Sequence, residues 1–305
     1  MVEILNTLMG ILNNIKSSLG ILKKIEINTS GETESLDNRS FELRVSMGDE
    51  DGYSVVDKFG VNLNITTTSD PEDIWEFGGI YNYDLFGTAP VMYISSSDSS
   101  DVGQSINVQG LDINGDFVEQ TISTNGQNNV SLTTPLWRIY RMQNTADFPD
   151  ILEGMLYCHT SPTNTNGVPP DASVRALIND GNNQTLMCLY TIPKGKVAFL
   201  YRGELGLQLE GNAGALAEFA HCHYESRRFG KNFTVKKAVT CLVGGSAIYQ
   251  DKRSFPDVIP ALTDIKLKVE EVSQTMGIWG TFDILLVDED KFSTEYLQAI
   301  GQPGY

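Results

Sequence analysis

Apolar side chains near the start of the chain recur in alternating steps of three and four residues, which is the spacing of a coiled-coil seam. We expect residues 1–29 to form an amphipathic helix that joins several copies of the chain in parallel. The pattern of leucine and isoleucine along this seam favours three strands, so the sequence predicts a homotrimer. The same stripe also fits a helix packed on the chain's own β-domain. The seam residues are Leu5, Leu8, Leu12, Ile15, Leu19 and Leu22.

The pattern changes after this helix. Residues 30–40 are almost entirely small or polar, which is typical of a flexible linker. From Phe41 onward, short runs of β-branched and aromatic residues alternate with clusters of Gly, Pro, Asn and Asp. This pattern predicts a mainly β protein with two β-sandwich or jelly-roll-like domains behind a coiled-coil-like helix. The turn-rich residues 179–183 indicate the junction between the two domains. We therefore expect a first sandwich at 41–180 and a second, jelly-roll-like one at 181–305.

Four local patterns predict individual elements. Asn114-Gly115 predicts a hairpin within residues 105–124, closed by a two-residue primed turn. Residues 265–270 alternate apolar and charged side chains, as in a strand with one wet face. Residues 282–287 are mostly apolar, which predicts a strand buried on both faces. Residues 293–300 read as a short helix that ends at Gly301.

Composition and charge narrow the range of partners. The chain has 305 residues and 41% hydrophobic content, enough for packed cores. It carries 22 Lys plus Arg against 39 Asp plus Glu, a net charge of −17, which repels nucleic acid and anionic lipid. The four cysteines are widely spaced, so we expect reduced core residues made in a cytoplasm. No apolar run approaches the roughly 20 residues that cross a bilayer, and we expect no membrane partner.

The most metal-like sequence is His221-Cys222-His223. Alternation along a strand places the two imidazoles on one face and the thiol on the other. Two histidines on one face can begin a metal site, but zinc usually takes a third or fourth protein ligand. We therefore interpret His221 and His223 as ordinary strand residues and keep them as metal candidates only.

A second candidate feature is a run of aromatic residues between glycines. Trp75, Phe77, Tyr81 and Tyr83 are interleaved with Gly78 and Gly79. Such a loop can recognise a sugar or a protein surface. The same residues can equally pack a long loop over its own core, and we favour that interpretation.

The sequence contains none of the common catalytic signatures. It has no G-x-S-x-G nucleophile elbow, no H-E-x-x-H pair and no Gly-rich phosphate loop. A carboxylate pair of the kind that cleaves glycans is visible only in three dimensions. We expect a protein that is not an enzyme and needs no cofactor.

Four segments resemble structural proteins of tailed bacteriophages, particularly marine phages. They are PEDIWEFGGIYNY at residues 71–83, QTLMCLYTIPKGKVAFL at residues 184–200, and TDIKLKV at 263–269 followed by FDILLVDED at 282–290. The resemblance implies a virion component assembled in the host cytoplasm, with other virion proteins as partners, and it brings no catalytic residues. We expect a trimeric capsid-decorating protein or head fibre. The alternatives are a tail fibre that recognises host surface glycan and a glycan depolymerase.

Overall fold

The structure is a computed structural model that describes residues 39–68, 71–147, 150–209 and 218–304. The chain divides into two units, residues 1–50 and 51–305, and each is treated by itself below. The predicted helix at 1–29, with its seam from Leu5 to Leu22, lies outside the described residues. The coiled coil and the linker at 30–40 therefore stay predictions.

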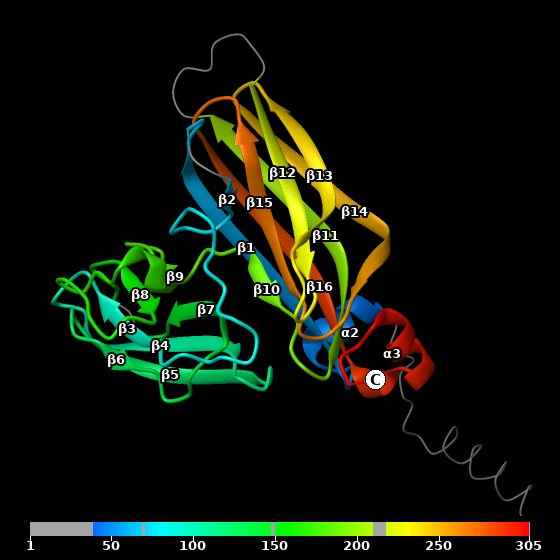
Figure 1. The fold of residues 1–305 in the computed structure, drawn as a ribbon, viewed down its shortest axis with the longest axis horizontal. Helices are drawn as coiled ribbons and strands as arrows, with labels where there is room; N and C mark the ends of the chain where they lie inside the picture. The colour runs from blue at the N-terminus through cyan, green and yellow to red at the C-terminus, as the bar shows by residue number, and fades with distance from the viewer. Residues whose placement is uncertain (1–38, 69–70, 148–149, 210–217, 305) are drawn as a thin grey trace, which may run out of the picture. The chain divides into compact units, whose positions relative to one another are not determined.

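In the first unit, Phe41–Met47 form a short helix, α2 (Figure 1). The Oγ of Ser40 caps it by accepting a hydrogen bond from the Leu43 N–H at 3.3 Å. Gly48, with a φ of 77°, ends it in the left-handed conformation. The prediction of β structure from Phe41 onward was wrong for this segment, because Ser40 and Gly48 supply a helix start and a helix stop.

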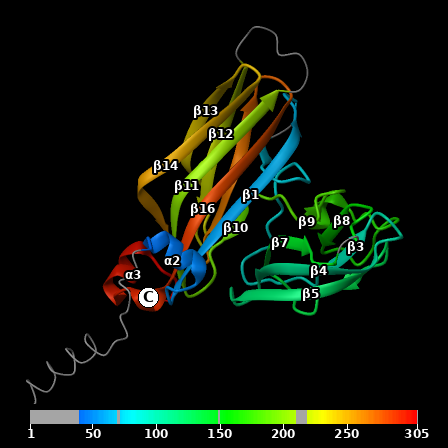
Figure 2. The same cartoon turned by 180° about the vertical axis from the view of Figure 1, so that it is seen from behind.

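The second unit contains an eight-stranded jelly roll (Figures 1 and 2). One sheet has the order β1-β16-β11-β14 and the other β10-β15-β12-β13. Numbered along the chain, the eight strands lie in the orders 1-8-3-6 and 2-7-4-5, which is the double Greek key of a jelly roll. The two-residue strand β2 adds to β15. The bounds are β1 Tyr53–Ile65, β2 Glu72–Asp73, β10 Leu189–Thr191, β11 Lys196–Leu209, β12 Glu218–Arg227, β13 Thr234–Val243, β14 Ser246–Ile259, β15 Asp264–Val272 and β16 Met276–Asp288.

A second β-structure is inserted between β1 and β10. Its two antiparallel sheets have the orders β6-β3-β8-β9 and β5-β4-β7, and they share their own apolar core. The fold is therefore mainly β, as predicted. Its strands are β3 Tyr93–Ser96, β4 Val102–Leu111, β5 Phe117–Asn125, β6 Val130–Ser131, β7 Arg138–Asn144, β8 Leu156–His159 and β9 Val174–Ile178, with a 3₁₀ turn η1 at Asp171–Ser173.

The strand pairing does not follow the predicted boundaries 41–180 and 181–305. Strand β1 lies in the proposed first domain, yet Tyr53 pairs with Val287 and the register continues to Asn62 opposite Ile278. The jelly roll therefore combines residues 53–65 with residues 189–288. Local patterning could not show this, because pairing between strands more than 200 residues apart leaves no signal in either segment.

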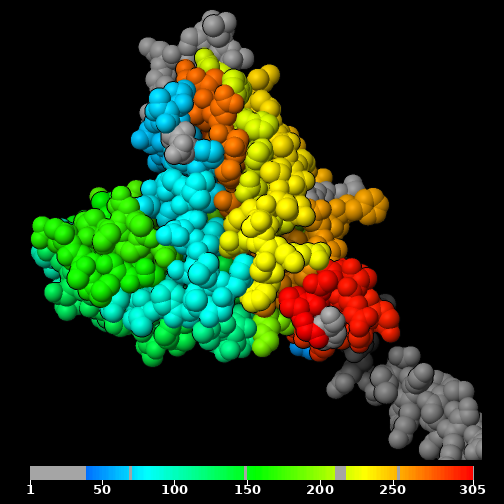
Figure 3. All heavy atoms as spheres, viewed as in Figure 1, coloured from blue at the N-terminus to red at the C-terminus, as the bar shows by residue number. Residues whose placement is uncertain are grey.

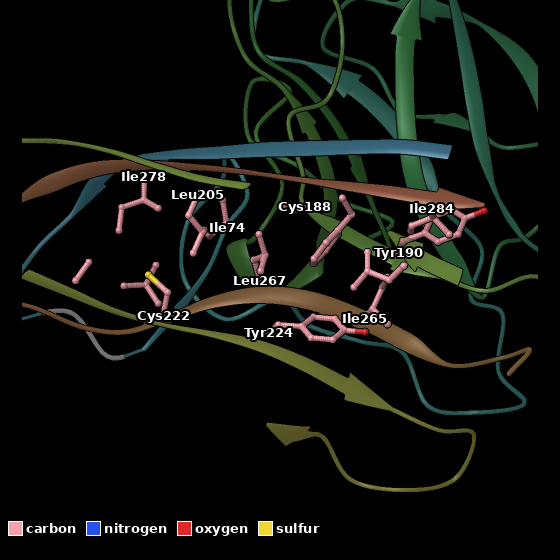
Figure 4. Packing of buried hydrophobic residues seen from close by; sticks show 14 of the residues in the cluster. Ile74, Cys188, Tyr190, Leu205, Cys222, Tyr224, Ile265, Leu267, Ile278 and Ile284 are labelled. Carbon is pink, nitrogen blue, oxygen red and sulfur yellow. The ribbon is translucent and has the colours of Figure 1, made fainter. Parts of the chain in front are cut away.

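The jelly-roll core lies between its two sheets. Figure 4 shows Leu205, Ile278 and Ile284 of one sheet facing Tyr224 and Leu267 of the other. The alternation of apolar residues in β15 and β16 directs these side chains inward. The interior is thus filled by side chains.

Gly60 allows β1 to pass against the chain that returns from the insert. A Cβ at this position would lie 2.2 Å from the Cys188 backbone nitrogen and 2.7 Å from the Ile74 carbonyl oxygen. No residue other than glycine fits between these backbone atoms. Gly60 therefore fixes where the inserted chain meets the jelly roll.

The predicted hairpin is present, but its turn differs from the prediction. Strands β4 and β5 pair from Val102 to Leu111, and Asp112 and Asp116 extend the pairing with a backbone hydrogen bond of 3.0 Å. The loop is therefore three residues long, with positive φ only at Gly115. The Asp112 carboxylate accepts hydrogen bonds from the Asn114 and Asp116 N–H groups and selects this longer turn.

The C-terminal predictions are confirmed. Residues 282–287 in β16 are buried apart from Asp283. After a 3₁₀ turn, η2 at Glu289–Lys291, helix α3 spans Thr294–Ile300, with Ser293 as its N-cap and Gly301 as its C-cap. The wet face predicted for residues 265–270 is wrong in part, because Lys266 is only 4% exposed.

Candidate interaction site

The aromatic segment of residues 75–83 packs against the protein, as the favoured interpretation predicts. Trp75 and Tyr81 are 3% and 5% exposed, and Phe77 and Tyr83 are half-buried. The Trp75 ring lies 5.3 Å from Phe77 and 5.0 Å from Tyr81, measured between centroids. Tyr81 and Tyr83 meet edge-on at 4.6 Å. These are geometries in which aromatic pairs attract each other.

Two carboxylates hold this segment in place. The Oε2 of Glu72 accepts hydrogen bonds from the Asn62 side chain at 2.7 Å and from the Gly79 N–H at 2.8 Å. The Oδ2 of Asp73 accepts from the Tyr81 N–H at 2.8 Å. Both carboxylates are buried, so their bonds to backbone N–H groups are strong. These hydrogen bonds fix the backbone of the segment to the residues before it.

A hollow of about 580 Å³ lies beside this segment. Phe77 and Ile80 contribute its apolar wall, and Asn82 and Asp171 contribute polar groups. Ile80 is 51% exposed, whereas the Trp75 indole N–H is already bonded to the Gly79 carbonyl at 3.0 Å. Of the predicted recognition residues, only Phe77 thus combines partial exposure with a place in the hollow.

Next to the segment lies a cluster of buried charges that the sequence did not reveal. Asp264 is fully buried and accepts two hydrogen bonds from Arg138, at 2.9 and 3.1 Å. Arg227 donates to the same carboxylate at 2.9 Å, and the Thr191 hydroxyl donates at 2.6 Å. Four strands, β7, β10, β12 and β15, meet at this carboxylate.

Aromatic rings cover the two guanidinium groups. Arg227 lies 4.6 Å from the Tyr83 centroid and 4.5 Å from that of Phe233, and Arg138 lies 5.1 Å from Tyr83. Such contacts strengthen when water is excluded. In Figure 3 cyan atoms of this part of the chain lie against yellow atoms of the jelly roll. The aromatic segment therefore covers the buried ion pairs that connect the insert to the jelly roll.

The charges continue along the second sheet of the jelly roll. The Lys266 ammonium lies 2.7 Å from Oδ1 of Asp73 and 3.7 Å from Oε2 of Glu225. Burial raises the pKa of Asp73, and the neighbouring Lys266 opposes that rise. The pair explains why Lys266 is buried within a pattern that predicted a wet face.

His221 and His223 lie on one face of β12 with Cys222 buried on the other, as predicted. Their Nε2 atoms are 3.1 Å apart, and the Nδ1 of His221 lies 2.9 Å from the Thr240 hydroxyl. In the described residues, no three His, Cys, Asp or Glu side chains gather closely enough to hold a metal ion. The pair is a hydrogen-bonded contact on the sheet surface.

An apolar row crosses the outer face of the other sheet. Val61 pairs with Trp279, Trp279 with Gly206, and Gly206 with Ile248. A Cβ at Gly206 would lie 1.8 Å from the Trp279 ring, so the indole lies across the glycine. Ile248 and the neighbouring Leu63 are 67% and 64% exposed. We call these five residues the apolar row.

All four cysteines are buried and free, as predicted for core residues. Burial raises the pKa of Cys158 and of Cys222 to about 12. No helix in the described part of the chain is long and apolar enough to cross a membrane.

Comparisons with known proteins give no family for the chain. No family model and no curated protein matches. Among solved structures, the infectious bursal disease virus Gx strain matches at 11% identity over 79% of this chain and 73% of that chain, with a TM-score of 0.23. The VP2 subviral particle of the same virus matches at 11% over 78% and 77%, with a TM-score of 0.19. A CBM22 tandem domain of Paenibacillus barcinonensis Xyn10C matches at 13% over 78% and 93%, with a TM-score of 0.20.

The weak structural neighbours are thus viral capsid proteins and a carbohydrate-binding module. At these TM-scores they establish no common fold, and the jelly-roll assignment rests on the strand order alone. The resemblance to tailed-phage proteins stays a prediction.

Proposed function

We propose that the chain is a structural protein of a tailed-phage virion, a homotrimer that decorates the capsid or forms a head fibre. The observation that carries the proposal is the jelly roll with a complete β-structure inserted between its first two strands. Jelly rolls serve as viral capsid, lectin and cupin domains. This argument is one of fold-level analogy, supported by the sequence resemblance.

The interior of the jelly roll supports a structural role. Its space is filled by apolar residues such as Leu205, Phe282 and Leu267. A packed interior stabilises the domain and leaves no room there for a cofactor or a substrate. We propose that the protein has no enzymatic activity and that its function lies in the surfaces it presents.

Self-association is the second part of the proposal. The seam from Leu5 to Leu22 predicts that three copies are held in parallel, which brings their jelly rolls close together. The apolar row, with Leu63 and Ile248 largely exposed, then provides a surface that a neighbouring copy can cover. Three linked copies add individually weak contacts to capsid proteins through effective concentration.

A tail fibre that recognises host glycan is the second candidate function. The hollow beside Phe77 and Ile80 favours it, since an exposed apolar wall with Asn82 and Asp171 at its edge suits a sugar. The net charge of −17 argues against nucleic acid as a direct partner in either role.

Labelling of purified particles tests the proposal. Antibodies raised against residues 51–305 should bind intact virions of the phage whose genome carries the gene. Quantitative mass spectrometry then separates the two candidates, because a head decoration is present in many copies and a tail fibre in few. Absence of the protein from purified particles would overturn both.

A further inference from the structure

A second hollow, of about 700 Å³, lies between β1 of the jelly roll and the β5-β4-β7 sheet of the insert. Four of its lining residues are cationic and only Asp57 carries a carboxylate, in a chain whose net charge is −17. The four cationic residues are Lys58, Arg141, Lys194 and Lys196. This concentration of positive charge suits an anionic ligand.

Three of these four cations have no carboxylate of the described residues within 4 Å. Lys196 is paired with Asp288. Arg141 donates to the Asp57 carbonyl oxygen at 3.0 Å, and Lys194 is exposed. An unpaired guanidinium and an unpaired ammonium at the edge of a hollow can both bind an incoming anion.

Lys58 differs from ordinary lysines, which are exposed, because it is only 3% exposed. Its Nζ donates to the Tyr140 carbonyl oxygen. An ammonium has three donors, so this single acceptor leaves it under-compensated in a buried site. Burial, with Arg141 nearby, lowers the pKa of Lys58 to about 7. A carboxylate in the hollow would supply the missing negative charge.

The remaining walls suit a sugar. Phe117 is 52% exposed and Phe59 half-buried, so each offers part of a ring to the apolar face of a pyranose. The amides of Gln109 and Gln184 provide donors and acceptors for hydroxyl groups. The volume falls within the usual range of ligand pockets, about 300–1,000 Å³.

We propose that this hollow binds an acidic saccharide, with the sugar carboxylate held by Lys58, Arg141 and Lys194. The site lies apart from the hollow beside Phe77. The proposed function bears only on where the protein would encounter such a sugar. Binding itself can therefore be tested with purified protein.

The experiment measures binding of trigalacturonic acid and of neutral galactotriose to the full chain by ligand-observed NMR. We expect saturable binding of the acidic trisaccharide only. Arg141→Gln and Lys194→Gln should each weaken it by about tenfold, since a charge-assisted hydrogen bond contributes roughly that factor. The matched control Lys236→Gln removes an exposed lysine from β13 and should leave the affinity unchanged.

The pH dependence provides a second readout. Arg141, Asp57 and Cys188 are the charged or titratable groups that act on Lys58, and Tyr140 and Tyr190 line the same hollow. Binding should be tighter at a pH of about 6 than at about 8.5, because Lys58 loses its proton between them. Lys58→Met, which replaces the buried ammonium by an apolar side chain, should remove this difference while the protein stays folded.

Three results would overturn the proposal. One is the lack of saturable binding of trigalacturonic acid up to about 10 mM, well above a Kd of 1 mM. Another is an equal loss in Arg141→Gln and Lys236→Gln. The third is equally tight binding of a triglutamate peptide, which would show attraction to negative charge without recognition of a sugar. None of these results bears on whether the protein is found in virions.

Discussion

Arg138 of the insert and Asp264 of the jelly roll form a bidentate ion pair, with hydrogen bonds of 2.9 and 3.1 Å. The two residues are 126 positions apart in sequence and are 3% and 0% exposed. Removal of Arg138 would take two charge-assisted hydrogen bonds from the buried Asp264, which would keep those from Arg227 and Thr191. The pair therefore links the inserted structure to the jelly roll and stabilises their contact.

Replacement of Arg138 should lower the free energy of unfolding substantially. We expect Arg138→Met to cost about 1.5–3 kcal/mol, measured by denaturant unfolding, because the buried Asp264 loses two charge-assisted hydrogen bonds and keeps those from Arg227 and Thr191. The matched control is Arg202→Met, since Arg202 pairs with Asp283 at 2.8 Å on the surface, with side chains 48% and 39% exposed. That variant should lose about 0–1 kcal/mol. Equal losses in the two variants would contradict the assigned role of Arg138.

Gly206 should be far less tolerant of substitution than Gly203 on the same strand. A Cβ at Gly206 would lie 1.8 Å from the Trp279 ring, whereas at Gly203 the nearest atom, the Thr281 carbonyl oxygen, is 3.6 Å away. We expect Gly206→Ala to displace Trp279 and to cost about 1–3 kcal/mol, typical of overpacking. Gly203→Ala should have little effect. Tryptophan fluorescence and thermal unfolding measure both changes, and identical behaviour of the two variants would refute the packing described for the apolar row.

His159 should make the protein less stable at mildly acidic pH. Burial lowers its pKa from 6.5 to about 4, and its Nδ1 has no hydrogen-bond partner. The unfolded chain therefore takes up the proton first as pH falls. Stability present above pH 6.5 is lost progressively between 6.5 and about 4. On acidification from a pH of about 7.5 to about 5, we expect a loss of about 2 kcal/mol of unfolding free energy from this residue.

The matched measurement compares unfolding of the wild type and of His159→Gln at a pH of about 7.5 and about 5. Carboxylates contribute equally in both proteins, so the difference in slope isolates the imidazole. The variant should lose less stability on acidification. Parallel pH profiles would show that His159 titrates normally in the folded state.

The cysteines should be unreactive in the native protein. All four are buried, and burial raises the pKa of Cys158 and Cys222 to about 12, so the reactive thiolate is scarce. A thiol reagent at a pH of about 8 should modify no cysteine in the folded protein and all four in denaturant. Rapid modification of a single cysteine under native conditions would place that residue at the surface.

Local signals predicted the elements that are set by neighbouring residues. Ser293 and Gly301 bound helix α3, as the sequence indicated. The alternation of side chains along a strand likewise places His221 and His223 on one face of β12, as predicted. The Asn114-Gly115 hairpin was predicted, although its turn type depends on a hydrogen bond from the Asn114 N–H to the Asp112 carboxylate, which the dipeptide does not encode.

Long-range pairing was not predictable. Nothing near Tyr53 shows that it faces Val287, so the jelly roll was divided at the wrong place. The burial of Lys266 follows from Asp73, a residue of a distant segment. The carboxylate of Asp264 accepts hydrogen bonds from side chains of three other strands, and each of these side chains alone looks like that of an ordinary surface residue.

A cryo-EM map of the intact particle tests the central claim most directly. We predict density in which the β1-β16-β11-β14 and β10-β15-β12-β13 sheets, with the inserted β-structure, fit as three copies around a common axis on the capsid. A well-resolved capsid and tail without density for this fold would contradict a role as a virion structural protein.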